Sequence, residues 1–565
     1  MSSTPLSVSL ASKTRIGLTS LFVVLVLILS ACGGSANNTN KSAKNTAMTI
    51  VTSPKGDFVN NFSPYAPTAS DGVQGPLYET LLFFNRMDGS VKPWLASSYK
   101  FSSDAKSLTF NLRQGVKWTD GTAFSSDDVV FTLNALKQYP AADSGGIWKY
   151  IDQVTAPDAN TVTVTFTKAY TPVVWYLGGQ VWILPKHLWS SVGDPTKYAN
   201  TTPVGTGPFK LKSNGFSPQL IDYVKNTDYW QPGKPEISEI KYPSFTSNTG
   251  AELVLSRGDL DWTGLFTPDV QKTYVNRDTQ HNHYWFPPSN VVVLYLNLAK
   301  APFNKLAVRQ AISSALDREQ MYKIGESGYS PVASPTGLVL PANKSFLASD
   351  YTNSAFAMDT AKSTQLLGDA GFKKGTDGIY ADASGKRLSF NINVVNGWTD
   401  WVTDCQIMST NLKKIGMEVK VNALSFNAYF SAMQLGTFDS VISWTNAGPT
   451  PYFLYNALLN STNTKPVGQA ATSNWARWND PATDTLLNQY ATSVDPAVQQ
   501  QAIAGIQKIM VEQVPSIPLF YGATWNEYST TRFTGWPTEQ NPYALPAPFS
   551  YPDNEIVLLN LHPVG

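Results

Sequence analysis

From residue 48 onward the sequence contains no further linker-like segment and no internal repeat of 20 to 50 residues, although this part makes up most of the 565-residue chain. A single hydrophobic core stops growing at about 250–300 residues, and longer chains divide into domains. Two or three structural units are therefore expected. Because no linker separates them, these units must share closely packed boundaries, which excludes a repeat array or a string of independent domains.

Hydrophobic periodicity predicts both strands and helices, in mixed order. TVTVTFT (161–167) alternates apolar and polar residues, as a half-buried strand does, whereas VVVLYLNL (291–298) is apolar on both faces. Apolar stripes predict helices through 308–321 and 401–412, and a third helix through 360–371 ends at a glycine. The predicted fold class is mixed α/β with several sheets.

Two short segments predict local architecture rather than chemistry. A serine followed by Asp127 and Asp128 suits a helix N-terminus, where acidic residues face the positive end of the helix dipole. Gly205 and Gly207 in PVGTGPF allow a close backbone approach and a turn before a strand. Neither segment predicts a catalytic or phosphate-binding role.

The composition excludes some partners and suggests others. Lys and Arg total 42 against 41 Asp and Glu and no long basic run occurs, so the sequence predicts no electrostatic footprint for nucleic acid or for an anionic membrane surface. With 42% hydrophobic and 15% charged residues, the chain is typical of a folded soluble protein. The 16 Trp, 26 Tyr and 27 Phe exceed what core filling alone demands, and they are candidate platforms for a ligand.

The first 47 residues predict export and lipid anchoring. Lys13 and Arg15 precede a short apolar stretch (21–29), which at nine residues cannot span a bilayer, so residues 1–31 are predicted to be a signal peptide. LSAC, ending at Cys32, resembles the bacterial lipobox, so Cys32 is the predicted lipidation site. Residues 33–47 contain no bulky apolar residue and form, with Cys32, a predicted flexible tether (32–47). The mature protein is expected outside the cytoplasm, in the periplasm or on the outer face of the cell membrane, held there by its lipid. The other cysteine, Cys405, is expected in a core.

Several strings resemble, in the family's order, solute-binding protein family 5. This family comprises the extracytoplasmic dipeptide-, oligopeptide- and nickel-binding proteins of ABC importers and includes oligosaccharide binders. The strings are LYETLL (77–82), PWLASSY (93–99), LTFNLRQGVKWTDGTAFSSDDVVFTL (108–133), PVGTGPFKL (203–211), VRQAISSALDRE (308–319), LKKIGMEV (412–419) and VPSIPLF (514–520). Together they extend over nearly the whole mature chain.

The resemblance implies a two-lobed periplasmic-binding-protein fold of type II, in its large form with an extra α/β domain on lobe I. The implied boundaries are 48–77, 201–298 and 523–565 for lobe I, 78–200 for the extra domain and 299–522 for lobe II. The chain then crosses twice between the lobes, and these crossings form a hinge. The implied function is reversible capture of an oligomeric solute for ABC permease subunits by a monomeric protein, without enzymatic activity and without a cofactor.

Ligand residues are expected where strands of such sheets end. Two loops follow predicted strands and carry indole rings beside amide and carboxylate groups, which suits the faces and hydroxyls of sugars. The loop after 438–443 supplies Trp444, Asn446 and Tyr452, and the loop after 388–395 supplies Asn396, Trp398 and Asp400. Trp262, Asn297 and the segment NNFSPY (60–65) are weaker candidates for the lobe I wall.

The ligand class stays open between oligosaccharide and peptide. Peptide-binding members commonly carry an Asp a few residues after the tryptophan that corresponds to Trp444, where it pairs with the ligand's α-ammonium. Ala447 stands at that position, so a peptide N-terminus lacks its partner unless another carboxylate such as Asp400 replaces it. The GPTPY string resembles cello-oligosaccharide-type members and adds a slight preference for a β-linked oligosaccharide, with peptides as the alternative.

An enzyme and a metal-binding protein are the rival classes. The sequence has no HExxH, GxSxG or Walker A motif and only four histidines, and no catalytic residue is predicted. His281 and His283 share one face of a strand, and the family includes nickel binders, but no cysteine or acidic residue stands beside them in HNH. No metal ligand is therefore predicted.

Overall fold

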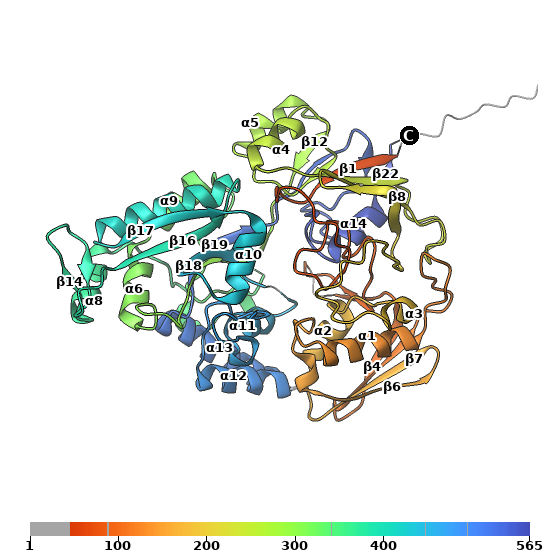
Figure 1. The fold of residues 1–565 in the computed structure, drawn as a ribbon, viewed down its shortest axis with the longest axis horizontal. Coiled ribbons are helices and arrows are strands. Elements are labelled where there is room, and N and C mark those ends of the chain that lie inside the picture. The colour runs from red at the N-terminus through yellow and green to blue at the C-terminus, as the bar shows by residue number, and fades with distance from the viewer. Residues whose placement is uncertain (1–45, 88–89, 341, 447, 494, 565) are drawn as a thin grey trace, which may run out of the picture. The chain divides into compact units, whose positions relative to one another are not determined.

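A computed structural model gives the fold of the chain (Figure 1) and describes residues 46 to 564 apart from 88–89, 341, 447 and 494. Three sheets of four or more strands organise these residues, beside separate two-stranded pairs. The fold is mixed α/β, as the sequence predicts. Among the described residues no helix combines the length and the apolar character needed to cross a membrane.

The seven-stranded sheet is the centre of lobe I. β1 lies in its middle and pairs in parallel with β10 on one side and β11 on the other. Its strands, in spatial order, are β12 (Asn282–Tyr284), β20 (Glu527–Ser529), β11 (Trp262–Thr263), β1 (Ala47–Val51), β10 (Glu239–Pro243), β9 (Leu220–Lys225) and β8 (Phe209–Ser217). Buried residues of β1, β9 and β10 form one core with the C-terminal helix α14 (Asp553–Asn560).

The five-stranded sheet is the centre of lobe II and is covered on both faces. Its strands are, in order, β17 (Glu418–Leu424), β16 (Ser389–Val395), β18 (Ser440–Trp444), β13 (Pro288–Leu296) and β19 (Ile517–Ala523). One face packs on α6 (Leu306–Ala315), α8 (Thr360–Asp369) and α9 (Thr399–Lys414). The other packs on α10 (Phe426–Leu435), α11 (Pro451–Leu459) and α13 (Pro496–Gln513), as the labels in Figure 1 show. This double covering explains why 291–296 is apolar at every position.

Two short segments connect the sheets. β12 lies in the seven-stranded sheet and β13 in the five-stranded sheet, so the first crossing falls at 285–287. The second falls at 524–526, between β19 and β20. The crossings lie side by side, because Trp285 N–H donates to the Asn526 carbonyl over 3.0 Å and Thr524 N–H donates to the Pro287 carbonyl over 2.9 Å. Residues 288–296 thus pair with lobe II strands, although the sequence-based boundary assigns them to lobe I; the other domain boundaries stay predictions.

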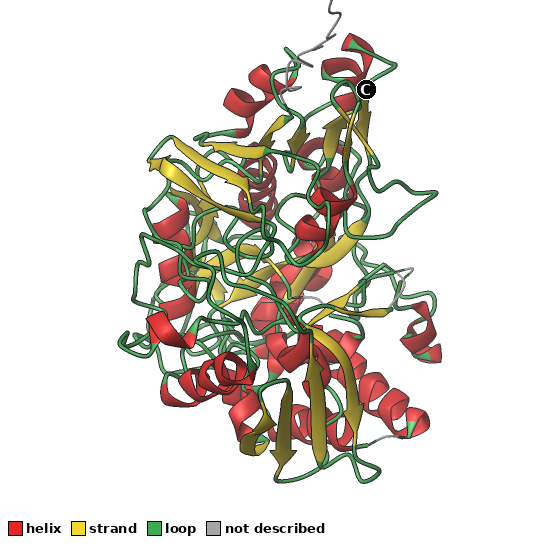
Figure 2. Ribbon diagram, turned by 90° about the vertical axis from the view of Figure 1, so that its right-hand side faces the viewer, coloured by secondary structure: helices red, strands yellow, loops and turns green. Residues whose placement is uncertain are grey.

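The four-stranded sheet lies within the predicted extra domain. Its order is β4 (Ala96–Phe101), β5 (Ser107–Leu112), β7 (Thr161–Phe166) and β6 (Ile151–Asp158). The alternating strand predicted at 161–167 is confirmed as β7, whose buried residues pack with α1 (Ser126–Gln138). Helices lie against one face of this sheet (Figure 2). The region also contacts lobe II, where the rings of Trp175 and Phe453 lie 5.8 Å apart.

Local predictions at helix ends and glycines hold with one exception. Ser125 caps α1, and its N–H donates to the Asp128 carboxylate over 3.0 Å. Gly205 lies so close to Leu77 that a Cβ would stand 1.9 Å from the Leu77 carbonyl oxygen. The helix predicted through 308–321 instead ends at Ala315, because the Asp317 side chain caps a separate turn, α7 (Arg318–Gln320).

Candidate functional site

Aromatic side chains gather where β16 and β18 end, on the side of lobe II that meets lobe I. Trp398, just after β16, is the centre of this group, and its ring lies 5.1 Å from that of Trp401 and 6.0 Å from that of Phe426. Trp444, the last residue of β18, is half-buried, and its ring lies 6.2 Å from that of Trp398. The structure therefore brings together the two tryptophans predicted from separate loops.

The loop that carries Trp398 also contacts lobe I. Trp398 Nε1–H donates to the carbonyl oxygen of Pro54 over 2.8 Å. Asn248, at the start of α4 (Asn248–Leu255), donates its backbone N–H to the Gly397 carbonyl over 3.1 Å. Gly397 has φ +89°, and a Cβ there would stand 2.3 Å from the Thr246 carbonyl oxygen, so the close approach of the lobes requires glycine.

Asp400 forms part of this interlobe contact. Its carboxylate is buried at 5% exposure and accepts a hydrogen bond from Asn248 Nδ2 over 3.2 Å. Burial raises the pKa of Asp400 to about 6, and burial together with the charge of Asp400 raises the pKa of Glu326 to about 8. These shifts reflect carboxyl groups taken out of water without a neighbouring cation. Asp400 thus contributes a buried, partnered acceptor rather than a free carboxylate.

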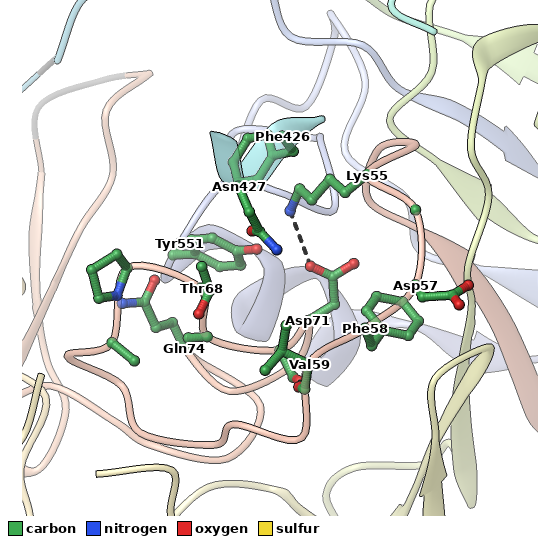
Figure 3. A pocket seen from close by; sticks show the side chains of 15 residues that line it. Lys55, Asp57, Phe58, Val59, Thr68, Asp71, Gln74, Phe426, Asn427 and Tyr551 are labelled. Atoms are coloured by element: carbon green, nitrogen blue, oxygen red, sulfur yellow. Dashed lines mark hydrogen bonds and ion pairs between the residues drawn. The ribbon is translucent and has the colours of Figure 1, made fainter. Parts of the chain in front are cut away.

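A cavity of about 220 Å³ adjoins the aromatic group. Its walls come from the segment between β1 and β2 (Leu82–Phe84), from Tyr551 just before α14, and from the first turn of α10. It is lined by Lys55, Gly56, Asp57, Phe58, Val59, Ala66, Pro67, Thr68, Ala69, Ser70, Asp71, Gln74, Phe426, Asn427 and Tyr551. Phe426 belongs to both the cavity lining and the aromatic cluster around Trp398, so the two adjoin each other. Figure 3 shows that the cavity has walls from both lobes.

An ion pair lies within this cavity. Lys55 Nζ lies 3.1 Å from Asp71 Oδ1, and the Asp71 side chain is only 5% exposed against 26% for Lys55. Thr52 donates its hydroxyl to the other Asp71 oxygen, and Tyr223 donates its hydroxyl to the Asp71 carbonyl over 2.6 Å. Figure 3 shows the side chains of Lys55, Asp71, Asn427 and Tyr551 converging. Asp71 is therefore held in place from several sides.

Sequence reasoning missed Lys55 and Asp71. They lie in a segment without helical or strand periodicity, and their neighbours in the cavity come from residues 426–427 and 551. The weak candidate NNFSPY (60–65) falls between the two lining stretches 55–59 and 66–71. The available signal was the presence of charged and amide residues in the segment that follows the first strand, which also contains aromatic residues. Such residues are candidates for contacts with a ligand.

Three predicted ligand residues lie in packed cores. Trp262 has no exposed surface, and its Nε1–H donates to Asn526 Oδ1 and to the Pro546 carbonyl, both over 2.9 Å. Asn297 is equally buried and donates to the carbonyls of Gly436 and Phe438. Tyr452 is 1% exposed and stacks on Tyr490 at 4.7 Å. A solute cannot touch these side chains unless the cores around them rearrange.

The remaining predicted residues lie at the surface or outside the described part. Asn396 and Asn446 are exposed beside the aromatic group. Ala447 and Cys32 lie outside the described residues. His281 Nδ1 pairs with Asp278 at 2.7 Å, while His283 Nε2 lies 3.4 Å from the Thr530 hydroxyl. The described residues contain no cluster of three or more His, Cys, Asp or Glu that could hold a metal ion.

Comparison with known proteins gives consistent matches. Residues 90–466 match the family model described as bacterial extracellular solute-binding proteins, family 5 Middle. The oligopeptide-binding protein AppA of Bacillus subtilis is 27% identical over 472 residues, which cover 79% of this chain and 83% of AppA.

Solved structures match over nearly their whole lengths. A periplasmic oligopeptide-binding protein from Thermotoga maritima, solved with bound mannohexaose, superposes with a TM-score of 0.86 at 24% identity, covering 92% of this chain and 99% of that chain. NikZ from Campylobacter jejuni, solved with Ni(L-His), superposes with a TM-score of 0.73 at 22% identity over 87% and 95% of the two chains. At these identities the structural matches establish the two-lobed fold.

Proposed function

This chain belongs to the bacterial extracellular solute-binding proteins of family 5, and on that premise we propose that it captures a β-linked oligosaccharide between its two lobes. The family consists of extracytoplasmic binding proteins that serve ABC importers. In this proposal the solute contacts both lobes at once, so binding stabilises the arrangement in which they meet. An ABC permease would then recognise the closed protein.

The cluster of aromatic side chains at the ends of β16 and β18 is the observation that carries this proposal. Trp398 and Trp444 are half-buried, and the exposed amides of Asn396 and Asn446 stand two positions from them in the sequence. Sugar rings stack on aromatic faces, while amides donate to and accept from hydroxyl groups. We place these four residues and the adjoining cavity in the ligand site, and we leave Trp262, Asn297 and Tyr452 out of it because they are buried in cores.

The same region offers little to a peptide N-terminus. An α-ammonium enclosed between the lobes needs a carboxylate partner, and Ala447 stands where peptide-binding members commonly have Asp. Asp400 is a poor substitute, because its carboxylate is buried and already accepts from Asn248. Asp71 is likewise paired with Lys55. These contacts favour a ligand without a free ammonium group.

Two alternatives remain in the same family. The relative AppA is named as an oligopeptide-binding protein, which favours peptides. The structure of NikZ with Ni(L-His) makes a nickel complex the other alternative. We further propose that the protein is monomeric. We also propose that a lipid on Cys32 holds it at the membrane, which mass spectrometry of the N-terminal peptide from membrane fractions would test.

Calorimetric titration of protein lacking the first 32 residues tests the ligand class. The titrants are cello- and manno-oligosaccharides from dimers to hexamers, di- to pentapeptides, and Ni²⁺ with and without histidine. We expect saturable binding of at least one oligosaccharide series, and compaction on binding in small-angle scattering. Binding of peptides or of nickel, with none of the sugars, would contradict the proposal.

A further inference from the structure

The cavity lined by Lys55, Asp71 and Tyr551 has a charge arrangement that selects among ligands. Its two inward-facing charges are opposite and 3.1 Å apart, so they already neutralise each other. Asp57, the other charged residue of the lining, is exposed, accepts from Gln219 at 3.2 Å and points away from the pair in Figure 3. An incoming cation is attracted by Asp71 but repelled by Lys55, whereas an anion is attracted by Lys55 but repelled by Asp71.

We propose that this cavity is a subsite for one uncharged sugar unit of the ligand, and that the Lys55–Asp71 pair makes it selective against charged sugars. The inference rests on the proposed saccharide ligand and specifies which saccharides are accepted. A volume of about 220 Å³ is below the ~300–1,000 Å³ of sites that enclose drug-sized ligands. It therefore suits one unit of an oligomer, while the rest extends along Trp398 and Trp444.

Hydroxyl groups match this pair because each is both donor and acceptor. One hydroxyl can donate to the Asp71 carboxylate while it, or its neighbour on the ring, accepts from the Lys55 ammonium. Asp71 is preorganised for this, because Thr52 and Tyr223 hold its side chain and its backbone. A carboxylate or ammonium on the sugar would leave one of the two protein charges facing a like charge in a partly desolvated site.

The other cavity residues complete the site for a sugar. Phe426 is half-buried, and Lys55 Nζ lies 5.7 Å from the centre of its ring, so the ammonium and an aromatic face border the same space. Asn427 is exposed, and its amide points to the ion pair in Figure 3. Both residues belong to the first turn of α10 in lobe II, whereas Lys55 and Asp71 belong to lobe I. A ring in the cavity therefore contacts both lobes.

Selectivity among three matched ligands tests the subsite. The probes are the neutral oligosaccharide that binds best, the same oligomer with its terminal unit oxidised to the uronate, and the same oligomer with a terminal 2-amino sugar. The variants are Asp71→Asn, which leaves Lys55 unpaired, and Lys55→Met, which leaves Asp71 unpaired. We expect the wild type to prefer the neutral ligand. Asp71→Asn should shift the uronate-to-neutral affinity ratio upward by roughly tenfold, and Lys55→Met should shift the amino-to-neutral ratio by a similar factor.

Affinity ratios keep the test valid when a variant is less stable, because partial unfolding lowers the apparent affinity for all three ligands by the same factor. Lys508→Met and Glu512→Gln are the matched controls, since they break an exposed ion pair of α13 outside the cavity lining and should leave the ratios unchanged. Unchanged ratios in the cavity variants, with neutral sugars still bound by the wild type, would overturn the subsite alone. A wild type that binds no saccharide would overturn the proposed ligand class, and the subsite with it.

Discussion

Trp398 donates its indole N–H to the carbonyl oxygen of Pro54 over 2.8 Å, although the two residues are 344 positions apart and lie in different lobes. The sequence predicts Trp398 as a ligand residue, and the structure shows that its side chain forms a contact between the lobes. The bond exists only while the lobes meet at this point. In the proposed function this bond would contribute to the closed arrangement that a bound solute stabilises.

Replacing Trp398 by Phe should weaken ligand binding while keeping an aromatic face. A hydrogen bond of this kind contributes about 0.5–1.5 kcal/mol, so we expect an affinity loss of up to roughly tenfold. Calorimetry gives the affinity, and small-angle scattering of the ligand-free protein should show a larger radius of gyration. Trp148→Phe is the control, because Trp148 Nε1–H donates to the Leu133 carbonyl within the extra domain. Equal effects of both variants on affinity would contradict the interlobe role.

Trp444→Ala should weaken binding by at least roughly 1 kcal/mol, because the half-buried indole is expected to stack on the ligand. Titration with the ligand that binds best measures this. Trp478→Ala removes another half-buried indole, outside the aromatic group, whose Nε1–H donates to Thr483. This control should lower stability but leave affinity intact. An unchanged affinity in folded Trp444→Ala protein would remove Trp444 from the site.

The elements were predictable where burial imposes a regular pattern. β7 and β13 follow directly from the alternating and the continuous apolar runs, because one is covered on one face and the other on both. The end of α6 was not predictable from its apolar stripe, since Leu316 is buried in an extended conformation next to the Asp317 cap. Periodicity reports burial, and local capping decides where a helix stops.

The site was predictable only in part, for a different reason. Trp398 and Trp444 follow strands, and strand ends meet at one edge of a sheet, so their proximity could be inferred. The same rule fails for Trp262 and Asn297, because a residue at a strand end can also point into the core. The Lys55–Asp71 pair lies in an irregular segment whose neighbours are set by the tertiary fold.

Glu527→Gln should stabilise the protein increasingly as the pH rises. Glu527 is fully buried in β20, and its Oε2 accepts from the Thr263 hydroxyl over 2.8 Å. Burial raises its pKa from 4.5 to about 8. Between these values the native state keeps a proton that the unfolded state has lost, so native stability falls as pH rises, by up to about 1.4 kcal/mol per pH unit for one group. Gln removes this dependence.

Thermal unfolding followed by circular dichroism checks the sign. The melting temperature of Glu527→Gln minus that of the wild type should be smallest near pH 4.5, increase up to about pH 8 and then level off. Glu512→Gln changes a half-exposed carboxyl group of α13 and should show no such trend. A difference that is constant over this range would mean that Glu527 is ionised in the native state throughout.

Gly205→Ala should destabilise the protein by about 1–3 kcal/mol, because a Cβ would overlap backbone atoms that cannot yield easily. The added carbon would lie 1.9 Å from the Leu77 carbonyl oxygen and 2.8 Å from its carbon. Gly368→Ala is the control, since Gly368 is exposed within α8 and has open space around it. That variant should gain about 0.5–1 kcal/mol from helix propensity. Melting temperatures that move in the same direction would contradict the crowding at Gly205.

The paired crossings limit how the two lobes can move. Two chain segments that run side by side and exchange backbone hydrogen bonds resist twisting and sliding far more than a single strand does, so bending about one axis remains the soft motion. If the lobes open, this pairing would guide them along nearly the same arc, and the surfaces that carry Lys55 and Trp444 would return to the same register. Solutes of different length would meet the same two lobe surfaces. Selection among them would then depend on how well each solute fills the space between the closed lobes.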